Sequence, residues 1–267
     1  MFYWRSEVSP GVWAAFTDLH AGNLALHAGD NHAQVPSHRA RLERAMGVPG
    51  GSLAFMNQNH STVAALAGLR EPPAVEGQAP AVEHAVPGAP DASGALDASG
   101  APDADAMVSA GGSRPLAVLV ADCVPVVIAA TAGDTGTVMI GVIHAGRLGV
   151  RNGIVKNTVA MMSSAGARSI SAWIGPSICG NCYEVPAEMR DDVAGLVPKA
   201  WAVTRWDTPG LNLPAAVKEQ LEQEGVSVHP VVAPSSSCTL ENGDLYSHRG
   251  STQGRPAGRF AGLVWRS

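Results

Sequence analysis

Three side chains at separate places in the sequence could together bind a catalytic metal ion. They are His60, Cys123 and His144. The first histidine follows an apolar segment, the cysteine interrupts an apolar run, and the second histidine ends the next one. A thiolate and two imidazoles suit Zn²⁺, and three protein ligands leave the fourth position open for chemistry. Taken singly, a buried cysteine usually packs in the core and a lone histidine usually makes structural hydrogen bonds. The wide spacing of the three therefore leaves both interpretations open.

The remaining cysteines include a C-x-x-C pair, Cys179 and Cys182, in a segment rich in glycine and proline. Such a pair can be half of a zinc site or a redox motif. A second pair that would complete a structural zinc site is absent from the sequence, and a thioredoxin-type pair should open a helix. We interpret the pair as two neighbouring structural thiols. Cys238 follows an expected strand and either packs in the core or faces the site.

Arg249 and Arg259, close to the C-terminus, are candidates for binding an anion. The guanidinium group offers charge-assisted and bidentate hydrogen bonds, which a phosphate needs. Ordinary surface charge is the alternative for both residues.

Composition restricts the function classes. The chain has 267 residues, of which 46% are hydrophobic, and a formal charge of −5. That charge argues against a nucleic-acid partner, because a phosphate footprint needs clustered lysine and arginine. The longest apolar run, 115–130, contains Asp122 and is too short to span a membrane. The first residues lack the pattern of a signal peptide, and four cysteines are few for a secreted disulfide-bonded domain, so we expect a cytoplasmic protein.

The elements that must position these residues alternate between strand and helix. Strands are expected within 11–31, 53–66, 114–131, 136–146, 169–175, 226–240 and 260–265. Helices are expected within 35–51, 151–167, 186–197 and 211–226. The alternation predicts an α/β fold. Neither a dinucleotide-binding glycine fingerprint nor a P-loop occurs in the sequence.

One segment differs in composition from the rest. From about residue 70 to 104 the sequence consists mostly of Ala, Pro, Gly, Asp and Ser without helical or strand periodicity. Such a segment cannot bury enough apolar area to offset its ordering entropy, so we expect a mobile surface insertion. The remaining residues of 1–267 are expected to form a single domain.

Several motifs occur in an order that resembles one family. They are A-D-C-x-P at 121–125, H-A-G-x-x-G at 144–149 and I-G-P-x-I-x-x-x-C-Y-E-V at 174–185, with matching segments over nearly the whole chain outside the insertion. The chain resembles the YfiH-type, laccase-domain family, once described as multicopper polyphenol oxidases and now regarded as purine nucleoside phosphorylases.

The resemblance implies a layered α/β/β/α fold with mixed sheets. It also implies that His60, Cys123 and His144 bind Zn²⁺, with copper as the less favoured metal. The implied substrates are a purine nucleoside (adenosine, inosine or methylthioadenosine) and phosphate, with adenosine deamination as an additional activity. A zinc ion with three protein ligands lowers the pKa of bound water to about 7, which suits deamination. Gln58, in the family's Q-x-H segment, Arg249 and Arg259 are then candidates for binding the substrates.

The sequence departs from the family pattern near these residues. The family's H-A-G-W-R-G is His144-Ala145-Gly146-Arg147-Leu148-Gly149 here, so the arginine comes one position earlier. Of the family's S-x-R-R only Arg249 is retained, with Gly250 in the last position. Metal binding survives both changes, and anion binding is the property that they affect.

Other functions compete with phosphorolysis. Cys123 as a nucleophile and His144 as its base would give a cysteine hydrolase or amidase. Multicopper phenol oxidation needs about ten histidines in ordered pairs, whereas this chain has 9 scattered ones without an H-x-H motif. A metal-binding protein with little turnover is the non-enzymatic alternative.

Overall fold

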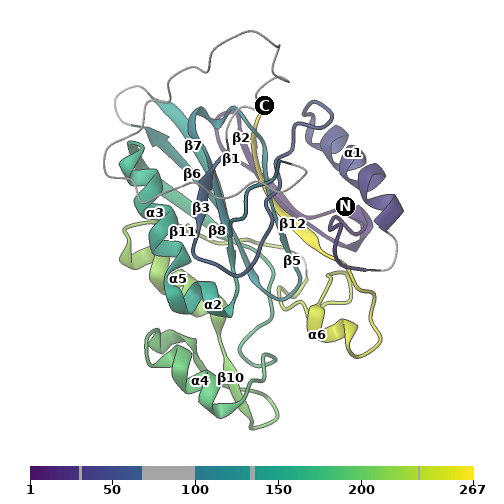
Figure 1. Ribbon diagram of the computed structural model, residues 1–267, viewed down its shortest axis with the longest axis vertical. Helices are drawn as coiled ribbons and strands as arrows, with labels where there is room; N and C mark the ends of the chain where they lie inside the picture. The colour runs from purple at the N-terminus through teal and green to yellow at the C-terminus, as the bar shows by residue number, and fades with distance from the viewer. Residues whose placement is uncertain (30–31, 68–99, 133–135, 234) are drawn as a thin grey trace.

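The computed structural model describes residues 1–29, 32–67, 100–132, 136–233 and 235–267. They form a four-layered α/β/β/α arrangement in which two sheets pack face to face between helices (Figure 1). The expected mixed α/β fold is confirmed. Within the described residues, no helix is long and apolar enough to cross a membrane.

The smaller sheet is antiparallel throughout and has the strand order β1-β2-β12-β5. Its strands are β1 (Phe2–Ser9), β2 (Val12–Thr17), β5 (Leu116–Val120) and β12 (Phe260–Arg266). The sequence analysis did not predict β1, which lies at the edge of this sheet. Its burial is intermediate or low at every position, so it lacks the continuous apolar run that marks the other strands.

The larger sheet is mixed and has the order β11-β8-β6-β7-β4-β3. Its strands are β3 (Ala64–Leu66), β4 (Ala106–Ser109), β6 (Val124–Ala132), β7 (Thr137–Ala145), β8 (Ala167–Ile174) and β11 (Ser227–His229). The pairs β3–β4 and β8–β11 are parallel and the others antiparallel. The strand expected over 226–240 is only the short β11, because Pro230 follows it and cannot donate to a strand partner.

Helices cover both outer faces (Figure 1). The helices are α1 (Val35–Met46), α2 (Arg147–Asn152), α3 (Ile154–Ser164), α4 (Ala187–Ala194), α5 (Leu213–Gln223) and α6 (His248–Ser251), with 3₁₀ turns at Leu19–Ala21, His32–Gln34, Ala110–Gly112 and Pro198–Ala200. A two-stranded hairpin of β9 (Trp201–Val203) and β10 (Pro209–Leu211) lies beside α4. The helix expected over 151–167 is interrupted at Gly153, which adopts φ 93° and separates α2 from α3.

Three apolar layers hold the fold together. One lies between the larger sheet and α3 and α5, one between the two sheets, and one between the smaller sheet and α1. Phe16 is fully buried in the middle layer. A Cβ at Gly175 would lie 2.3 Å from the ring of Phe16, so the glycine of the I-G-P motif makes room for this ring. Truncating a buried phenylalanine costs about 3–5 kcal/mol.

The run 114–131, expected as one strand with a polar interruption, contributes to both sheets. Its first part is β5 of the smaller sheet and its second part is β6 of the larger sheet. Asp122 and Cys123 lie where the chain passes from one sheet to the other. The interruption in the apolar pattern therefore marks a change of sheet.

Part of the expected insertion can be compared with the structure. Residues 68–99 lie outside the described residues, but the end of the segment is ordered. The Asn57 N–H donates to the Pro102 carbonyl at 2.9 Å, and Ala104 is fully buried. Residues 100–104 thus belong to the framework that leads into β4.

Candidate active site

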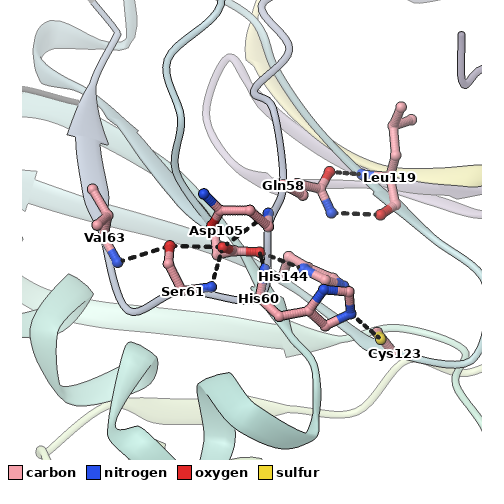
Figure 2. Close-up of polar contacts among 9 residues, drawn as sticks. Gln58, His60, Ser61, Val63, Asp105, Leu119, Cys123 and His144 are labelled. Atoms are coloured by element: carbon pink, nitrogen blue, oxygen red, sulfur yellow. Dashed lines mark hydrogen bonds and ion pairs between the residues drawn. The ribbon is translucent and has the colours of Figure 1, made fainter. Parts of the chain in front are cut away.

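His60, Cys123 and His144 converge at the junction of the two sheets (Figure 2). One ligand atom from each lies within 4.8 Å of the others, with the Cys123 Sγ 3.9 Å from the His60 Nε2. The two imidazole rings have centroids 4.9 Å apart. His60 comes from the loop before β3, Cys123 from the sheet change, and His144 from the end of β7. This arrangement of three donors could hold one metal ion.

Two of these segments have an unusual backbone. His60 has φ 62° and Asp122, directly before Cys123, has φ 81°. Non-glycine residues in the left-handed region are strained and persist where the surroundings hold them. The Asp122 carboxylate accepts hydrogen bonds from the Thr239 hydroxyl at 2.5 Å and from the backbone N–H of Arg249 at 2.7 Å. These bonds fix the turn that presents the cysteine.

Asp105 holds the loop that carries His60. Its fully buried carboxylate accepts backbone N–H bonds from His60 at 3.1 Å and Ser61 at 2.6 Å, and also the Ser61 hydroxyl at 2.7 Å (Figure 2). The same carboxylate lies 2.6 Å from the His144 Nδ1. One carboxylate therefore positions both histidines, and it leaves the Nε2 of His144 to face Cys123.

The electrostatics of the metal-free site favour an ion pair. Burial opposes the charged form of Cys123, but the charge of His144 and hydrogen bonds from both histidines lower its pKa to about 6. Burial likewise opposes charge on His144, but Cys123 and Asp105 raise its pKa to about 9. Burial also opposes the charge of Asp105, and hydrogen bonds from His144 and Ser61 outweigh it and lower the pKa of this carboxyl. At neutral pH the site holds a thiolate beside an imidazolium, and a thiolate is the form that binds metals.

A glycine is required beside these ligands. A Cβ at Gly146 would lie 2.8 Å from the His60 ring and 3.2 Å from the Cys123 sulfur. The glycine of the H-A-G motif therefore allows the ligands to approach one another. The sequence motif alone does not indicate this role of the glycine.

Two cavities meet at this centre and share His60, Ala121, Cys123 and His248. The larger has a volume of about 390 Å³ and is lined further by Arg147, Leu148, Ile178, Tyr183, Leu213 and Arg249. The smaller has a volume of about 270 Å³ and is lined further by His27, Gln58, Leu119, Val120, His144 and Arg259. Burial and then the positive charges of Arg259, Arg39 and His32 lower the pKa of His27, so cationic groups gather around the smaller cavity.

The three expected substrate-binding residues lie at different places. Arg249 lines the larger cavity, where its guanidinium lies over the Tyr183 ring and donates to the Glu184 carbonyl at 3.0 Å. Arg259 lines the smaller cavity, so the two arginines do not form one clamp. The amide of Gln58 makes hydrogen bonds of 2.7 and 2.9 Å with the backbone of Leu119 (Figure 2). Gln58 thus joins the His60 loop to β5.

Sequence reasoning missed several residues of the site. Asp105 stands in the matched segment D-A-M-V-S-A, but nothing in its spacing connects it to the histidines. Tyr183 belongs to the C-Y-E-V motif, and Arg147 is the residue that departs from the family pattern; both line the larger cavity. Motif membership was the available signal for these two, and contact with the centre required the structure.

A second group of metal-ligand side chains lies outside this centre. Cys179, Cys182, Cys238 and Glu241 bring their ligand atoms within 4.8 Å of one another. The C-x-x-C pair therefore has two further partners, which the sequence analysis had not joined to it. Together they could bind a metal.

The fold and the centre define a mixed α/β protein with a three-donor metal-type site between two sheets. The family model described as "Multi-copper polyphenol oxidoreductase laccase" matches residues 5–267, and the chain belongs to this family. The predicted membership of the laccase-domain family is confirmed.

Named relatives and solved structures cover almost the whole chain. It is 37% identical over 271 residues to "Purine nucleoside phosphorylase ORF3" of Streptomyces griseus, covering 97% of this chain and 96% of that protein. It is 37% identical to "Purine nucleoside phosphorylase Rv2149c" of Mycobacterium tuberculosis, covering 91% and 84%. The structure of the Neisseria meningitidis protein NMB0706 superposes with a TM-score of 0.73 at 27% identity, covering 100% and 99%. The Bacillus licheniformis protein YfiH shares the fold, with a TM-score of 0.72 at 24% identity and coverage of 96% and 93%.

Proposed function

We propose that this chain is a zinc-dependent purine nucleoside phosphorylase that uses His60, Cys123 and His144 as its metal centre. The observation that carries the proposal is the position of these donors between two cavities, a larger one with aromatic and apolar walls that also holds Arg147 and Arg249, and a smaller one that holds Arg259 and several histidines. Phosphorolysis needs a nucleoside site and an anion site on two sides of one reacting carbon. Relatives that carry the name purine nucleoside phosphorylase support the substrate class.

The nucleoside is assigned to the larger cavity. Leu148, Ile178 and the ring of Tyr183 offer the apolar and aromatic surface that a purine base prefers. Arg147 and Arg249 line the same cavity and can donate hydrogen bonds to the base or the ribose. The proposed substrates are adenosine, inosine and methylthioadenosine.

Phosphate is assigned to the smaller cavity. Arg259 supplies a guanidinium there, and the lowered pKa of His27 reflects, after burial, the positive charge of its neighbours. A dianion is favoured in such a field and can bind the guanidinium bidentately. Both arginines were expected to bind the anion. We now assign only Arg259 to phosphate and Arg249 to the nucleoside.

The reaction exchanges one bond for another. A phosphate oxygen bonds to the C1′ of the ribose while the bond between C1′ and the purine nitrogen breaks, and the released purine takes up the proton that the hydrogen phosphate gives up. The products are the free base and ribose 1-phosphate, or its 5-methylthio derivative when methylthioadenosine is the substrate. Arg259 orients the nucleophile, and the cavity walls around Tyr183 hold the base, so both reactants are presented to each other in a fixed geometry. Positive charge from Arg147 and Arg249 stabilises the electrons that remain on the purine.

The donor set suits Zn²⁺. A thiolate and two imidazoles are common zinc ligands, and the hydrogen bond from His144 to Asp105 is the usual support of a metal-binding histidine. A zinc ion bound there supplies a Lewis acid beside the reacting atoms. Among the described residues, groups of three or more ligand-type side chains occur only here and at the Cys179 cluster, and together they hold two of the about ten histidines that multicopper oxidation needs.

The test is turnover of each nucleoside by zinc-quantified protein, with and without phosphate, followed by chromatography of the products. Free base that appears only with phosphate, and not with Cys123→Ala or His60→Ala, supports the proposal. Arg259→Ala should raise the KM for phosphate at least tenfold, and Arg249→Ala should raise the KM for the nucleoside. Arg168→Ala, an exposed residue of β8, is the matched control. Free base formed equally without phosphate would contradict phosphorolysis, and inosine formed from adenosine would add deamination.

One observation favours a second function. Cys123, His144 and Asp105 are arranged as nucleophile, base and orienting acid, with a lowered pKa on the cysteine. This order matches a cysteine hydrolase or amidase. A trapped acyl-thioester on Cys123, detected by mass spectrometry after incubation with an activated amide or ester, would establish it. Retained zinc without turnover of either substrate class would leave a metal-binding protein.

A further inference from the structure

The second cluster of ligand-type side chains is assembled by two loops that are distant in sequence. Cys179 and Cys182 lie between β8 and α4, and Cys238 and Glu241 lie after β11. All four ligand atoms are within 4.8 Å of one another, and the Cys182 Sγ lies 3.6 Å from the Glu241 Oε1. A tetrahedral zinc site with Zn–S of about 2.3 Å and Zn–O of about 2.0 Å holds sulfur and oxygen about 3.5 Å apart. The spacing is therefore close to that of ligands to a shared ion.

The backbone brings these side chains together by its own hydrogen bonds. The carbonyl of Cys179 accepts N–H bonds from Cys182 at 3.0 Å and from Tyr183 at 2.9 Å, which forms the turn of the C-x-x-C segment. Gly180 is required in this turn, because a Cβ there would lie 2.9 Å from Asn212. The chain around Cys238 pairs with Ser177 in an isolated parallel bridge. The cluster is thus held by framework contacts.

The surroundings suit a charged thiolate centre. The Cys179 N–H donates to the Cys238 Sγ at 3.5 Å, a type of bond that supports metal-bound thiolates. Arg205 contacts both the Cys182 sulfur and the Glu241 carboxylate. Three thiolates and a carboxylate with a divalent ion carry a net charge of −2, which the guanidinium partly offsets. A cation at this position, paired with Glu241, therefore suits such a centre.

We propose that Cys179, Cys182, Cys238 and Glu241 bind a structural zinc ion, separate from the His60–Cys123–His144 centre. Three soft sulfur donors select Zn²⁺ over magnesium or calcium, which prefer oxygen. The protein supplies all four ligands of a tetrahedral ion, and a closed coordination sphere is the property of a structural site.

The position of the site indicates what it stabilises. Ile178 and Tyr183, which flank the C-x-x-C segment, both line the larger cavity. Thr239, next to Cys238, donates to the Asp122 carboxylate that fixes the Cys123 turn. A zinc ion here fastens together the two loops that form one wall of the cavity. It contributes to stability because the unfolded chain lacks the preformed site.

The test is site-resolved zinc counting in the full chain. Protein purified without chelators is analysed by elemental mass spectrometry as wild type, as a His60→Ala/Cys123→Ala variant and as a Cys179→Ser/Cys238→Ser variant. The variant that lacks the first centre should retain about one zinc ion per chain. With Co²⁺ in place of zinc it should show the intense near-ultraviolet thiolate-to-cobalt band of a multi-thiolate site. The Cys179→Ser/Cys238→Ser variant should lose this ion and unfold at a lower temperature.

A milder pair of variants covers the case in which loss of two cysteines prevents folding. Glu241→Gln should release the zinc to a chelator at least tenfold faster than wild type, and Glu241→Cys, a fourth thiolate, should release it more slowly. Glu224→Gln, exposed at the end of α5, should behave as wild type. Absence of zinc from the His60→Ala/Cys123→Ala variant would overturn the proposal. A Cys179–Cys182 disulfide in the purified protein would also overturn it in favour of a redox pair. Neither outcome depends on catalytic turnover.

Discussion

Asp105→Asn isolates the contribution of one buried carboxylate to the metal centre. The side chain keeps its size but loses its charge and exchanges one acceptor oxygen for an NH₂ group. In the wild type both oxygens accept, one from the His144 Nδ1 at 2.6 Å and the other from the Ser61 N–H at 2.6 Å. In the variant one donor must therefore face the amide nitrogen. Either the tautomer of His144 or the loop that carries His60 is disturbed.

The expected effect follows from this geometry. Loss of a carboxylate behind a metal-binding histidine lowers metal affinity roughly 10- to 100-fold, which is about 1.4–2.8 kcal/mol. A buried donor without a partner costs a further ~1–3 kcal/mol of folding stability. Asp192→Asn is the matched control, because that carboxylate pairs with Arg151 at 2.6 Å in an exposed position. An exposed ion pair contributes little to stability, because solvent screens it, and it does not reach the centre.

The assay measures zinc at this centre alone. Protein in a series of zinc buffers is treated briefly with iodoacetamide, and alkylation of Cys123 is quantified by peptide mass spectrometry. Bound zinc protects the thiolate, so the free zinc concentration for half-protection reports the affinity of this site. Asp105→Asn should move half-protection to at least tenfold more zinc, and Asp192→Asn should leave it unchanged. If both variants matched the wild type within threefold, the argument that Asp105 positions His144 for the metal would be wrong.

Three further predictions concern other links between the structure and its behaviour. In metal-free protein the pKa of Cys123 is lowered to about 6 and burial raises the pKa of Cys182 to about 12. The alkylation rate of Cys123 should therefore rise with a midpoint near pH 6. Its thiolate fraction at pH 7 should exceed that of an ordinary cysteine about 30-fold. A midpoint of the alkylation rate near pH 8.5, or faster labelling of Cys182, would contradict this. Gly146→Ala should abolish zinc protection of Cys123, because the added methyl meets the His60 ring at 2.8 Å, while Gly243→Ala, with open space around it, should not. Glu43→Ala should destabilise the protein by about 2 kcal/mol in urea unfolding without changing zinc affinity, because this buried carboxylate accepts backbone N–H bonds at 2.9 and 3.0 Å; an unchanged midpoint would show that these bonds are replaced by water.

The sequence allowed the class of fold and the three donors to be predicted because both depend on local patterns. Apolar runs mark strands, and the polar residues Asp122–Cys123 and His144 stand out where such runs break or end. Asp105 could not be found in this way. Its role comes from hydrogen bonds to His60, Ser61 and His144, which lie 45, 44 and 39 positions away, and nothing in the neighbouring sequence indicates them. The Cys238–Ser177 bridge was missed for the same reason, since its two residues are distant in the chain.

The departure from the family's H-A-G-W-R-G motif can be interpreted only with the position of Arg147 in the structure. From the sequence, an arginine one position early suggested that anion binding was impaired. In the structure Arg147 is the first residue of α2, Leu148 is the next, and both line the larger cavity. The arginine stands at position 147 here, and the family has it at the position of Leu148. A guanidinium therefore remains in the cavity, but it starts from a point about 100° away around the helix axis. Because the three proposed metal ligands and Gly146 lie before this point in the chain, the departure should affect which nucleoside fits the cavity and should leave the proposed metal centre intact.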